Sequence, residues 1–189
     1  MIHQEGGCKV EVEKRIGKAW DRWRSLTGVL CDKKVPTRLK MLLYKVCIRP
    51  AMLYGHEIWP LTQRLEDRIC TSEMRMLRYI QGISLEEHLR NEEIREKAGI
   101  EAISIVMRKR RLQWYGHVCR RKESDDIKKV TNVKVNGKRG RGRPKHRWKD
   151  TIKADMKMWK LETKDTDDRE RWRALIELGA MQKPVTRKE

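Results

Sequence analysis

Apolar residues recur at intervals of three and four positions through most of the chain, the spacing of one face of an α-helix. The first such pattern consists of Val12, Ile16, Ala19, Trp20 and Trp23. A second begins after Pro36, because proline is favoured in the first turn of a helix. Its apolar positions are Leu39, Leu42, Leu43 and Val46. Pro50 lacks a backbone N–H, so we expect it to break or kink this helix near Ile48.

The same spacing predicts further helices beyond residue 60. One has its apolar face at Leu65, Ile69, Met76, Leu77 and Ile80. It should stop at Gly82, and a polar helix over residues 86–98 should stop at Gly99. Another helix is expected over about residues 102–121.

Two helices are predicted after residue 146. The first has a stripe made of Trp148, Ile152, Met156 and Trp159. For the second, Asp167 and Glu170 form a plausible capping pair. A short alternation over residues 130–135 is the strand candidate of the sequence. The pattern as a whole predicts an all-α protein.

Composition divides the chain into four predicted parts. Residues 1–60 are expected to form a helical bundle and residues 61–121 a basic helical extension. Residues 122–145 become rich in Gly and Arg, which predicts a flexible basic linker, and residues 146–180 should form a C-terminal helical pair.

The net charge narrows the classes of partner. The chain carries +19 on 189 residues with a pI near 10.0, and its mean hydropathy is −0.84. Such a charge favours nucleic acid, an anionic membrane surface or an acidic protein as partner. No apolar run approaches the roughly 20 residues of a membrane-spanning helix, and no signal-peptide pattern opens the chain. We therefore expect no membrane insertion and no secretion.

Cysteine usage indicates the compartment. The five cysteines are scattered and none forms a C-x-x-C pair, so neither a disulfide framework nor a zinc knuckle is predicted. A reducing compartment, nuclear or cytoplasmic, fits this pattern best.

The strongest single signal is the segment over residues 138–147. It holds six cations, and its two glycines and one proline disfavour helix and strand. These cations would bind a polyanion by displacing its counterions, although a solvated basic loop is the simpler alternative. The predicted phosphate-binding residues are Lys138, Arg139, Arg141, Arg143, Lys145 and Arg147.

Within this segment, residues Arg141 to Pro144 match the core of an AT-hook. In that motif an extended R-G-R-P stretch lies in a narrow minor groove, where the negative potential attracts arginine. Gly142 would be needed because a side chain would lift the backbone off the groove floor. An AT-hook-type or chromatin-associated protein is therefore the alternative reading, together with a ribosomal-type or scaffold protein.

A second basic segment lies in the helix predicted over residues 102–121. It contains Arg108, Lys109, Arg110 and Arg111, and then Trp114, Tyr115 and His117. Cations interleaved with rings could hold phosphates and stack on bases, so Trp114 and His117 join the predicted nucleic-acid-binding residues. In the alternative interpretation the rings are core and the arginines are solvated.

Catalysis is poorly supported by the sequence. Four acidic pairs occur, Glu86-Glu87, Glu92-Glu93, Asp125-Asp126 and Asp167-Asp168. Each lies in a polar segment where a solvated helix face or a helix cap explains it. A two-metal site needs carboxylates that converge from packed elements, and no P-loop or H-E-x-x-H motif is present. We predict no catalytic residue, no metal site and no cofactor.

Several strings resemble the region after the catalytic palm of LINE-type (non-LTR, RTE-like) retrotransposon reverse transcriptases. They are KAWDRWR at residues 18–24, RPAMLYGHEIW at 49–59, EMRMLR at 73–78, RNEEIR at 90–95, RLQWYGHV at 111–118 and RGRPKHRW at 141–148. The series follows the family order from about Glu5 to Ile176, which is nearly the whole chain.

The resemblance implies that residues 1–60 form a thumb-like domain that grips the template–primer duplex. The remainder would be a basic extension that holds RNA or target DNA. The family's Tyr/Phe-x-Asp-Asp motif is absent, because Glu123 stands where Asp125-Asp126 would need a ring. The apurinic-type endonuclease domain and a Cys/His knuckle are absent as well. We therefore expect a nucleic-acid-binding fragment that is not an enzyme alone and whose partners are RNA, DNA or hybrid and a missing palm domain.

Overall fold

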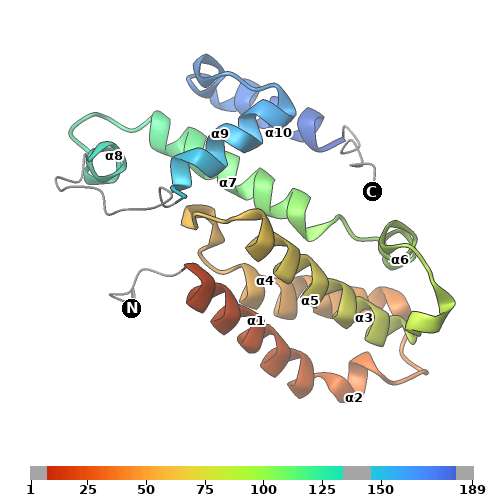
Figure 1. Cartoon of the computed structure of the whole chain (residues 1–189). Helices are drawn as coiled ribbons and strands as arrows, with labels where there is room; N and C mark the ends of the chain where they lie inside the picture. Colours follow the sequence, from red (N-terminus) through yellow and green to blue (C-terminus); the bar gives the residue numbers. More distant parts are fainter. Residues whose placement is uncertain (1–7, 134–145, 182–189) are drawn as a thin grey trace. The chain divides into compact units, whose positions relative to one another are not determined.

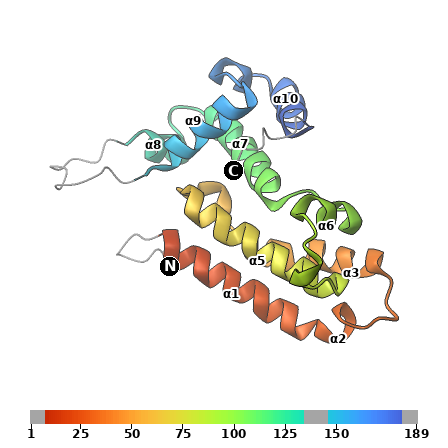
Figure 2. The same cartoon turned by 45° about the vertical axis from the view of Figure 1, so that its right-hand side comes forward.

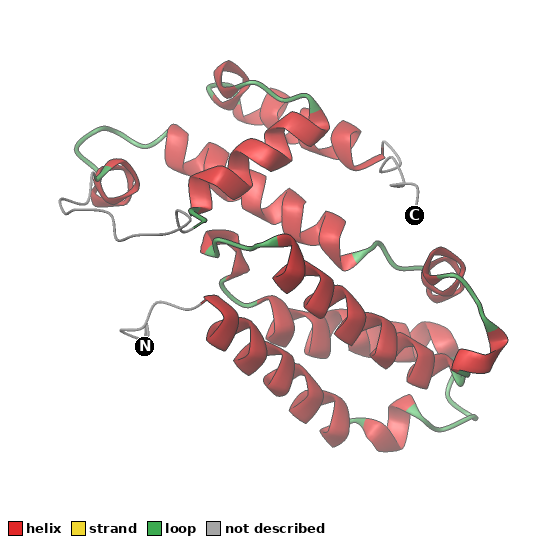
Figure 3. Cartoon of the chain, in the orientation of Figure 1, coloured by secondary structure: helices red, strands yellow, loops and turns green. Residues whose placement is uncertain are grey.

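The computed structural model describes residues 8–133 and 146–181, and in these two ranges the chain forms helices joined by turns, without a strand (Figure 3). The predicted all-α class is confirmed. The chain divides into two compact units, Met1–Val106 and Met107–Glu189, called unit 1 and unit 2 below.

Unit 1 is built on three long helical segments. Helix α1 (Cys8–Ser25) is followed by the short α2 (Thr27–Leu30). A continuous segment then consists of α3 (Thr37–Leu43), the π-helical turn η1 (Tyr44–Ile48) and α4 (Arg49–Leu53). After a 3₁₀ turn, η2 (His56–Ile58), comes α5 (Gln63–Gln81). Helices α1 and α5 run in the same direction and the α3–α4 segment returns against them (Figures 1 and 2).

A second, shorter layer follows α5. The chain forms a 3₁₀ turn, η3 (Leu85–Glu87), and then α6 (Asn91–Ala98), which packs on α3 and α5. Helices α5 and α6 end at Gly82 and Gly99, whose φ angles of 67° and 60° suit glycine, as predicted. The helix predicted over residues 86–98 is shorter than expected, because His88 adopts a left-handed φ of 48° after the turn.

Pro50 does not break its helix. A proline cannot donate to the carbonyl four residues earlier and its ring crowds that carbonyl. The chain accommodates it with the π turn, in which the Arg49 N–H donates to the carbonyl of Tyr44, five residues back. The sequence predicted a break or a kink near Ile48; the break is wrong, and the structure has a local widening within a continuous helical segment.

The π turn also aligns two side chains. In an α-helix, residues five apart point about 140° away from each other. The wider turn stacks Arg49 above Tyr44, so that both reach the same carboxylate, Glu73 of α5.

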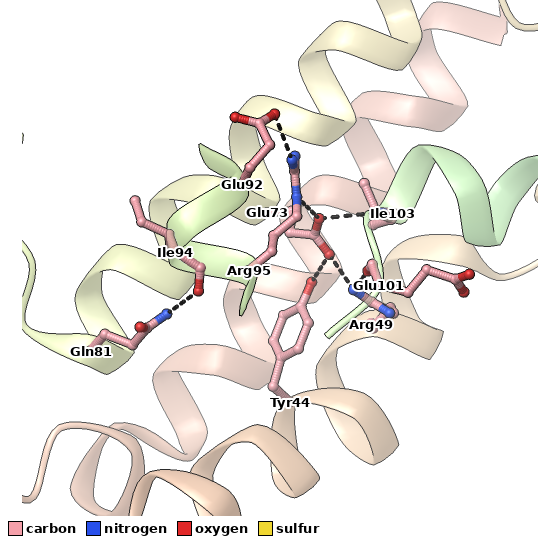
Figure 4. Close-up of polar contacts among 9 residues, drawn as sticks. All are labelled: Tyr44, Arg49, Glu73, Gln81, Glu92, Ile94, Arg95, Glu101 and Ile103. Atoms are coloured by element: carbon pink, nitrogen blue, oxygen red, sulfur yellow. Dashed lines mark hydrogen bonds and ion pairs between the residues drawn. The ribbon is translucent and has the colours of Figure 1, made fainter. Parts of the chain in front are cut away.

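Glu73 is fully buried and accepts hydrogen bonds from two segments of unit 1, while a third segment places a cation nearby (Figure 4). It accepts from the Tyr44 hydroxyl at 2.9 Å and from Arg49 at 2.7 Å. The backbone N–H of Ile103 donates at 3.2 Å, and Arg95 of α6 lies 3.9 Å away. Burial and then the charge of Glu73 raise the pKa of Tyr44 well above its ordinary value, so the phenol remains a donor.

The apolar positions of the α3–α4 segment are divided between two faces. Met41, Tyr44 and Ile48 are buried, whereas Leu39, Leu42 and Val46 are exposed. Of the periodic set recognised in the sequence, Leu43 is half-buried and the other three residues are exposed, because the interior of unit 1 is closed by the opposite face of the same helical segment.

Unit 2 contains the larger part of α7 (Ile103–Cys119) and the helices α8 (Asp126–Asn132), α9 (Trp148–Trp159) and α10 (Arg169–Met181). A 3₁₀ turn, η4 (Thr163–Thr166), joins α9 to α10. Helix α10 packs on both η4 and α9. Val130 lies in α8, which corrects the strand candidate of residues 130–135 and places a helix within the predicted linker. At the start of α10 the N–H groups of Glu170 and Arg171 donate to Asp168, one residue beyond the predicted cap.

Trp172 of α10 is the largest fully buried side chain among the described residues of unit 2. Its Nε1–H donates to the Leu112 carbonyl of α7 at 2.9 Å. The indole reaches this carbonyl because Gly116, one turn further along α7, has no side chain, and a Cβ there would overlap the indole ring. The contact between α7 and α10 therefore depends on a glycine.

Gly116→Ala should lower the free energy of unfolding by about 1–3 kcal/mol, because the Trp172 indole must move and its hydrogen bond lengthens. The matched control is Gly17→Ala in α1, where a Cβ meets no atom within 4 Å. That change should stabilise the protein by about 0.5–1 kcal/mol, since alanine favours a helix interior. Chemical denaturation measures both, and two changes of equal sign would contradict the packing described for Trp172.

Candidate nucleic-acid interface

The net charge is concentrated in unit 2. Residues 107–189 hold 27 Lys and Arg against 12 Asp and Glu, a net charge of +15. Residues 1–106 hold 19 against 15, a net charge of +4. The electrostatic attraction of the chain for a polyanion therefore originates mainly in unit 2.

Two of the four predicted cations of α7 are structural. Arg108 and Arg111 are buried, and their Nε atoms donate to the two carboxylate oxygens of Asp155 in α9, at 2.9 and 2.6 Å. The Arg108 guanidinium also lies 5.5 Å from the centre of the Trp159 ring. Because both side chains point into unit 2, we leave them out of the candidate interface.

Asp155 is the centre of this buried cluster. It is 4% exposed and accepts hydrogen bonds from the guanidiniums of Arg108 and Arg111. The Nη atoms of Arg111 are buried without a hydrogen-bond partner among the described residues. A buried cation is stable only when it is paired, so Asp155 holds α9 against α7. Sequence reasoning missed Asp155, although its position inside an apolar stripe of α9 was a visible signal.

The outward side of α7 carries a different set, which we call the α7 stripe: Arg110, Trp114, His117 and Arg121. Their spacing of four, three and four places them along one side of the helix and its C-terminal turn. Arg110, His117 and Arg121 are exposed and Trp114 is half-buried. Arg121 is an addition to the sequence prediction, and its spacing from His117 is the signal that could have found it.

The rings of the α7 stripe are held in place by one another and by Arg121. Trp114 and His117 stack with ring centres 5.3 Å apart and an angle of 28° between their planes. The Arg121 Nε–H donates to His117 Nε2 at 3.2 Å, and its Nη1 lies 3.2 Å from Asp125. The stripe thus presents a cation, two stacked rings and a second cation in order.

The other residues of the predicted interface have mixed positions. Lys109 is half-buried and lies 2.6 Å from Glu177 of α10. Arg147 is exposed next to the start of α9, where its backbone N–H donates to Asp150 at 2.9 Å. The remaining predicted residues, Lys138, Arg139, Arg141, Gly142, Arg143, Pro144 and Lys145, lie outside the described residues.

The acidic pairs have local partners or lie exposed. Ser84 and Glu87 cap the turn η3, and Asp125 accepts from the Ile127 N–H at the start of α8. In the described ranges no three His, Cys, Asp or Glu side chains are placed to hold a metal ion together. No described helix combines the length and the apolarity that crossing a bilayer requires.

The fold and the surface define an all-α protein with a strongly basic second unit that exposes cations beside aromatic rings. Comparison with known proteins finds no matching family model and no matching solved structure. A Caenorhabditis elegans protein, whose name describes it as uncharacterized and transposon-derived, is 28% identical over 196 residues. That similarity covers 93% of this chain and 67% of the worm protein, and it indicates an origin in a transposon.

Two arginines of α7, Arg108 and Arg111, are buried in an ion-pair cluster, whereas Arg110 is exposed, so mutations of the two kinds should differ in their effect on stability. Asp155→Ala leaves two buried guanidiniums without their carboxylate, so it should lower the free energy of unfolding by about 3–5 kcal/mol. Arg110→Ala removes an exposed side chain of the same helix and should change stability by no more than about 0.5 kcal/mol. Denaturant titration compares the two variants. A stable Asp155→Ala protein would show that the cluster does not hold α9.

Proposed function

We propose that this chain binds nucleic acid through unit 2, as the nucleic-acid-holding part of a transposon-derived reverse transcriptase of LINE type. The observation that carries the proposal is the concentration of positive charge in residues 107–189 beside the exposed α7 stripe. The similarity to a protein named as transposon-derived supports the origin in a mobile element. The reverse transcriptase is proposed from the sequence resemblance.

Two kinds of contact follow from the chemistry of these residues. The cations of residues 138–147 would bind phosphates, and each contact releases counterions from the nucleic acid. The rings of Trp114 and His117 offer flat faces to unpaired bases, with Arg110 and Arg121 beside them for the flanking phosphates. Such a surface holds a strand without reading much of its sequence.

On this proposal the chain holds template, primer or target and performs no nucleotide transfer by itself. The absence of the Tyr/Phe-x-Asp-Asp motif from the sequence supports this part of the proposal. Purified full-length chain should therefore give no magnesium-dependent primer extension. Extension that is lost on mutation of one of its acidic pairs would contradict it.

The basic segment provides the central test. Its six cations, Lys138, Arg139, Arg141, Arg143, Lys145 and Arg147, are replaced together by Ala in the full chain. Each phosphate contact adds about 0.9 to the slope of log K against log salt, so loss of four to six contacts should reduce the slope on B-DNA by roughly 3.6–5.4. Fluorescence anisotropy over a salt series on duplex DNA and on RNA–DNA hybrid measures this. Unchanged affinity at every salt concentration would refute phosphate binding by this segment.

Gly142 distinguishes the proposal from an AT-hook. A bulky residue at this position would keep an extended segment out of a narrow minor groove. Contacts to phosphates do not need such a close approach of the backbone. If the segment contacts phosphates only, Gly142→Leu should leave binding to AT-rich and GC-rich duplexes almost unchanged. A selective loss of affinity for the AT-rich duplex would favour the AT-hook instead.

A further inference from the structure

The solvent-facing side of the α3–α4 segment carries a row of apolar residues that the interior of unit 1 does not use (α3 in Figure 1). Leu39, Leu42 and Val46, which we call the apolar row, are 46, 53 and 63% exposed. Their spacing of three and then four residues makes successive members neighbours on the helix surface. This is the spacing by which two helices dock on each other.

The positive charge of unit 1 is concentrated in the same segment. Residues 33–56 hold six Lys and Arg and no Asp or Glu, whereas the rest of residues 1–106 holds 13 Lys and Arg against 15 Asp and Glu. The segment is therefore cationic within a unit whose remainder has a slightly negative net charge. A partner that covers this segment gains free energy from acidic residues at the contact.

Two exposed cations, Arg38 and Lys45, follow one edge of the apolar row. They are seven residues apart, which is about 10 Å along a helix. Each directly precedes a member of the row, so the two occupy the position written g when Leu39 and Val46 are written a. Lys45 donates to the Gly99 carbonyl at 2.9 Å, and neither cation has a carboxylate partner among the described residues. In helix pairs the charge at this position selects the partner.

We infer that the apolar row docks an amphipathic α-helix of another protein, whose apolar stripe is flanked by Asp or Glu. The row would pack on that stripe, and Arg38 and Lys45 would pair with two acidic residues seven positions apart. The inference goes beyond the proposed function and does not depend on it, because it concerns unit 1 and a protein partner.

Two other occupants fit this surface less well. A second copy of the chain offers no acidic residue on the same segment, so its Arg38 and Lys45 would stay unpaired or repel their equivalents. An anionic bilayer has no fixed spacing of charges, so cations in heptad register gain nothing there over cations in any other arrangement.

Two synthetic peptides of identical composition serve as probes for the full chain. The first has leucine at a and d of three successive heptads and glutamate at e and g, which keeps it from pairing with itself. The second has the same residues in an order that destroys the apolar stripe. It measures the non-specific attraction of an acidic peptide to the basic unit 2. Fluorescence anisotropy should show the heptad peptide bound about tenfold more tightly than the scrambled one.

The apolar contribution is tested by replacing the row with glutamine. Glutamine is a good helix former, so the Tm of this variant should not fall, while its affinity for the heptad peptide should drop about tenfold. The control variant changes three exposed apolar residues on other segments of unit 1 and should bind like the parent. The row variant is Leu39→Gln, Leu42→Gln and Val46→Gln, and the control is Val10→Gln, Ile58→Gln and Leu85→Gln.

The charge contribution is tested by a second pair of variants. Arg38→Glu with Lys45→Glu turns two attractions into repulsions and should weaken binding of the heptad peptide about tenfold. Lys18→Glu with Arg75→Glu makes the same change of net charge at exposed positions of α1 and α5 and should leave that binding unchanged. A difference between these two variants supports the edge of the apolar row as the contact.

Other outcomes would overturn the inference. Equal affinity of the parent for both peptides, or binding of neither, would exclude an acidic helix as the occupant. Heptad-peptide binding that survives both the glutamine change and the charge reversal would place the contact elsewhere. If the parent binds neither peptide but sediments as a dimer that the glutamine change dissociates, the row joins two copies. If it binds phosphatidylserine vesicles and neither peptide, the row contacts a membrane.

Discussion

A carboxylate taken out of water must be matched by cations and hydrogen-bond donors, and in each unit of this chain such a group joins separate helices. In unit 1, Glu73 receives donors from the α3–α4 segment and from the start of α7, with Arg95 of α6 nearby. In unit 2, Asp155 receives two guanidiniums from α7. Both groups join segments that are far apart in the sequence. Loss of either carboxylate leaves buried cations, which is more costly than loss of an apolar contact of similar size.

This constraint divides the cations of the chain into two populations. Arg49, Arg108 and Arg111 are buried beside carboxylates, so their charges are largely neutralised within the fold. The exposed cations of the α7 stripe lie in the unit with the larger net charge. The side of α7 that carries a residue decides its role, since Arg110 and Arg111 are neighbours in sequence and face opposite environments.

Local pattern predicted much of the fold, because glycine stops and helical periodicity depend on neighbouring residues. The ends of α5 and α6 at Gly82 and Gly99 follow from such signals. Local pattern did not reveal the partners of α7, because Asp155 lies more than forty residues from Arg108 and Arg111. For the same reason the sequence could not show that Arg108 and Arg111 are buried whereas Arg110, in the same basic run, is exposed. The buried face of the α3–α4 segment, with Met41, Tyr44 and Ile48, was missed as well, because burial depends on packing against segments distant in the sequence.

On the proposed function, unit 2 is the part of the chain that holds nucleic acid. Photo-crosslinking of the full chain to a duplex with a single-stranded overhang, followed by peptide mass spectrometry, tests it most directly. We expect adducts concentrated in residues 107–189, with Trp114 among them. Adducts concentrated in residues 1–106, with the peptides of α7 and α9 unmodified, would contradict it.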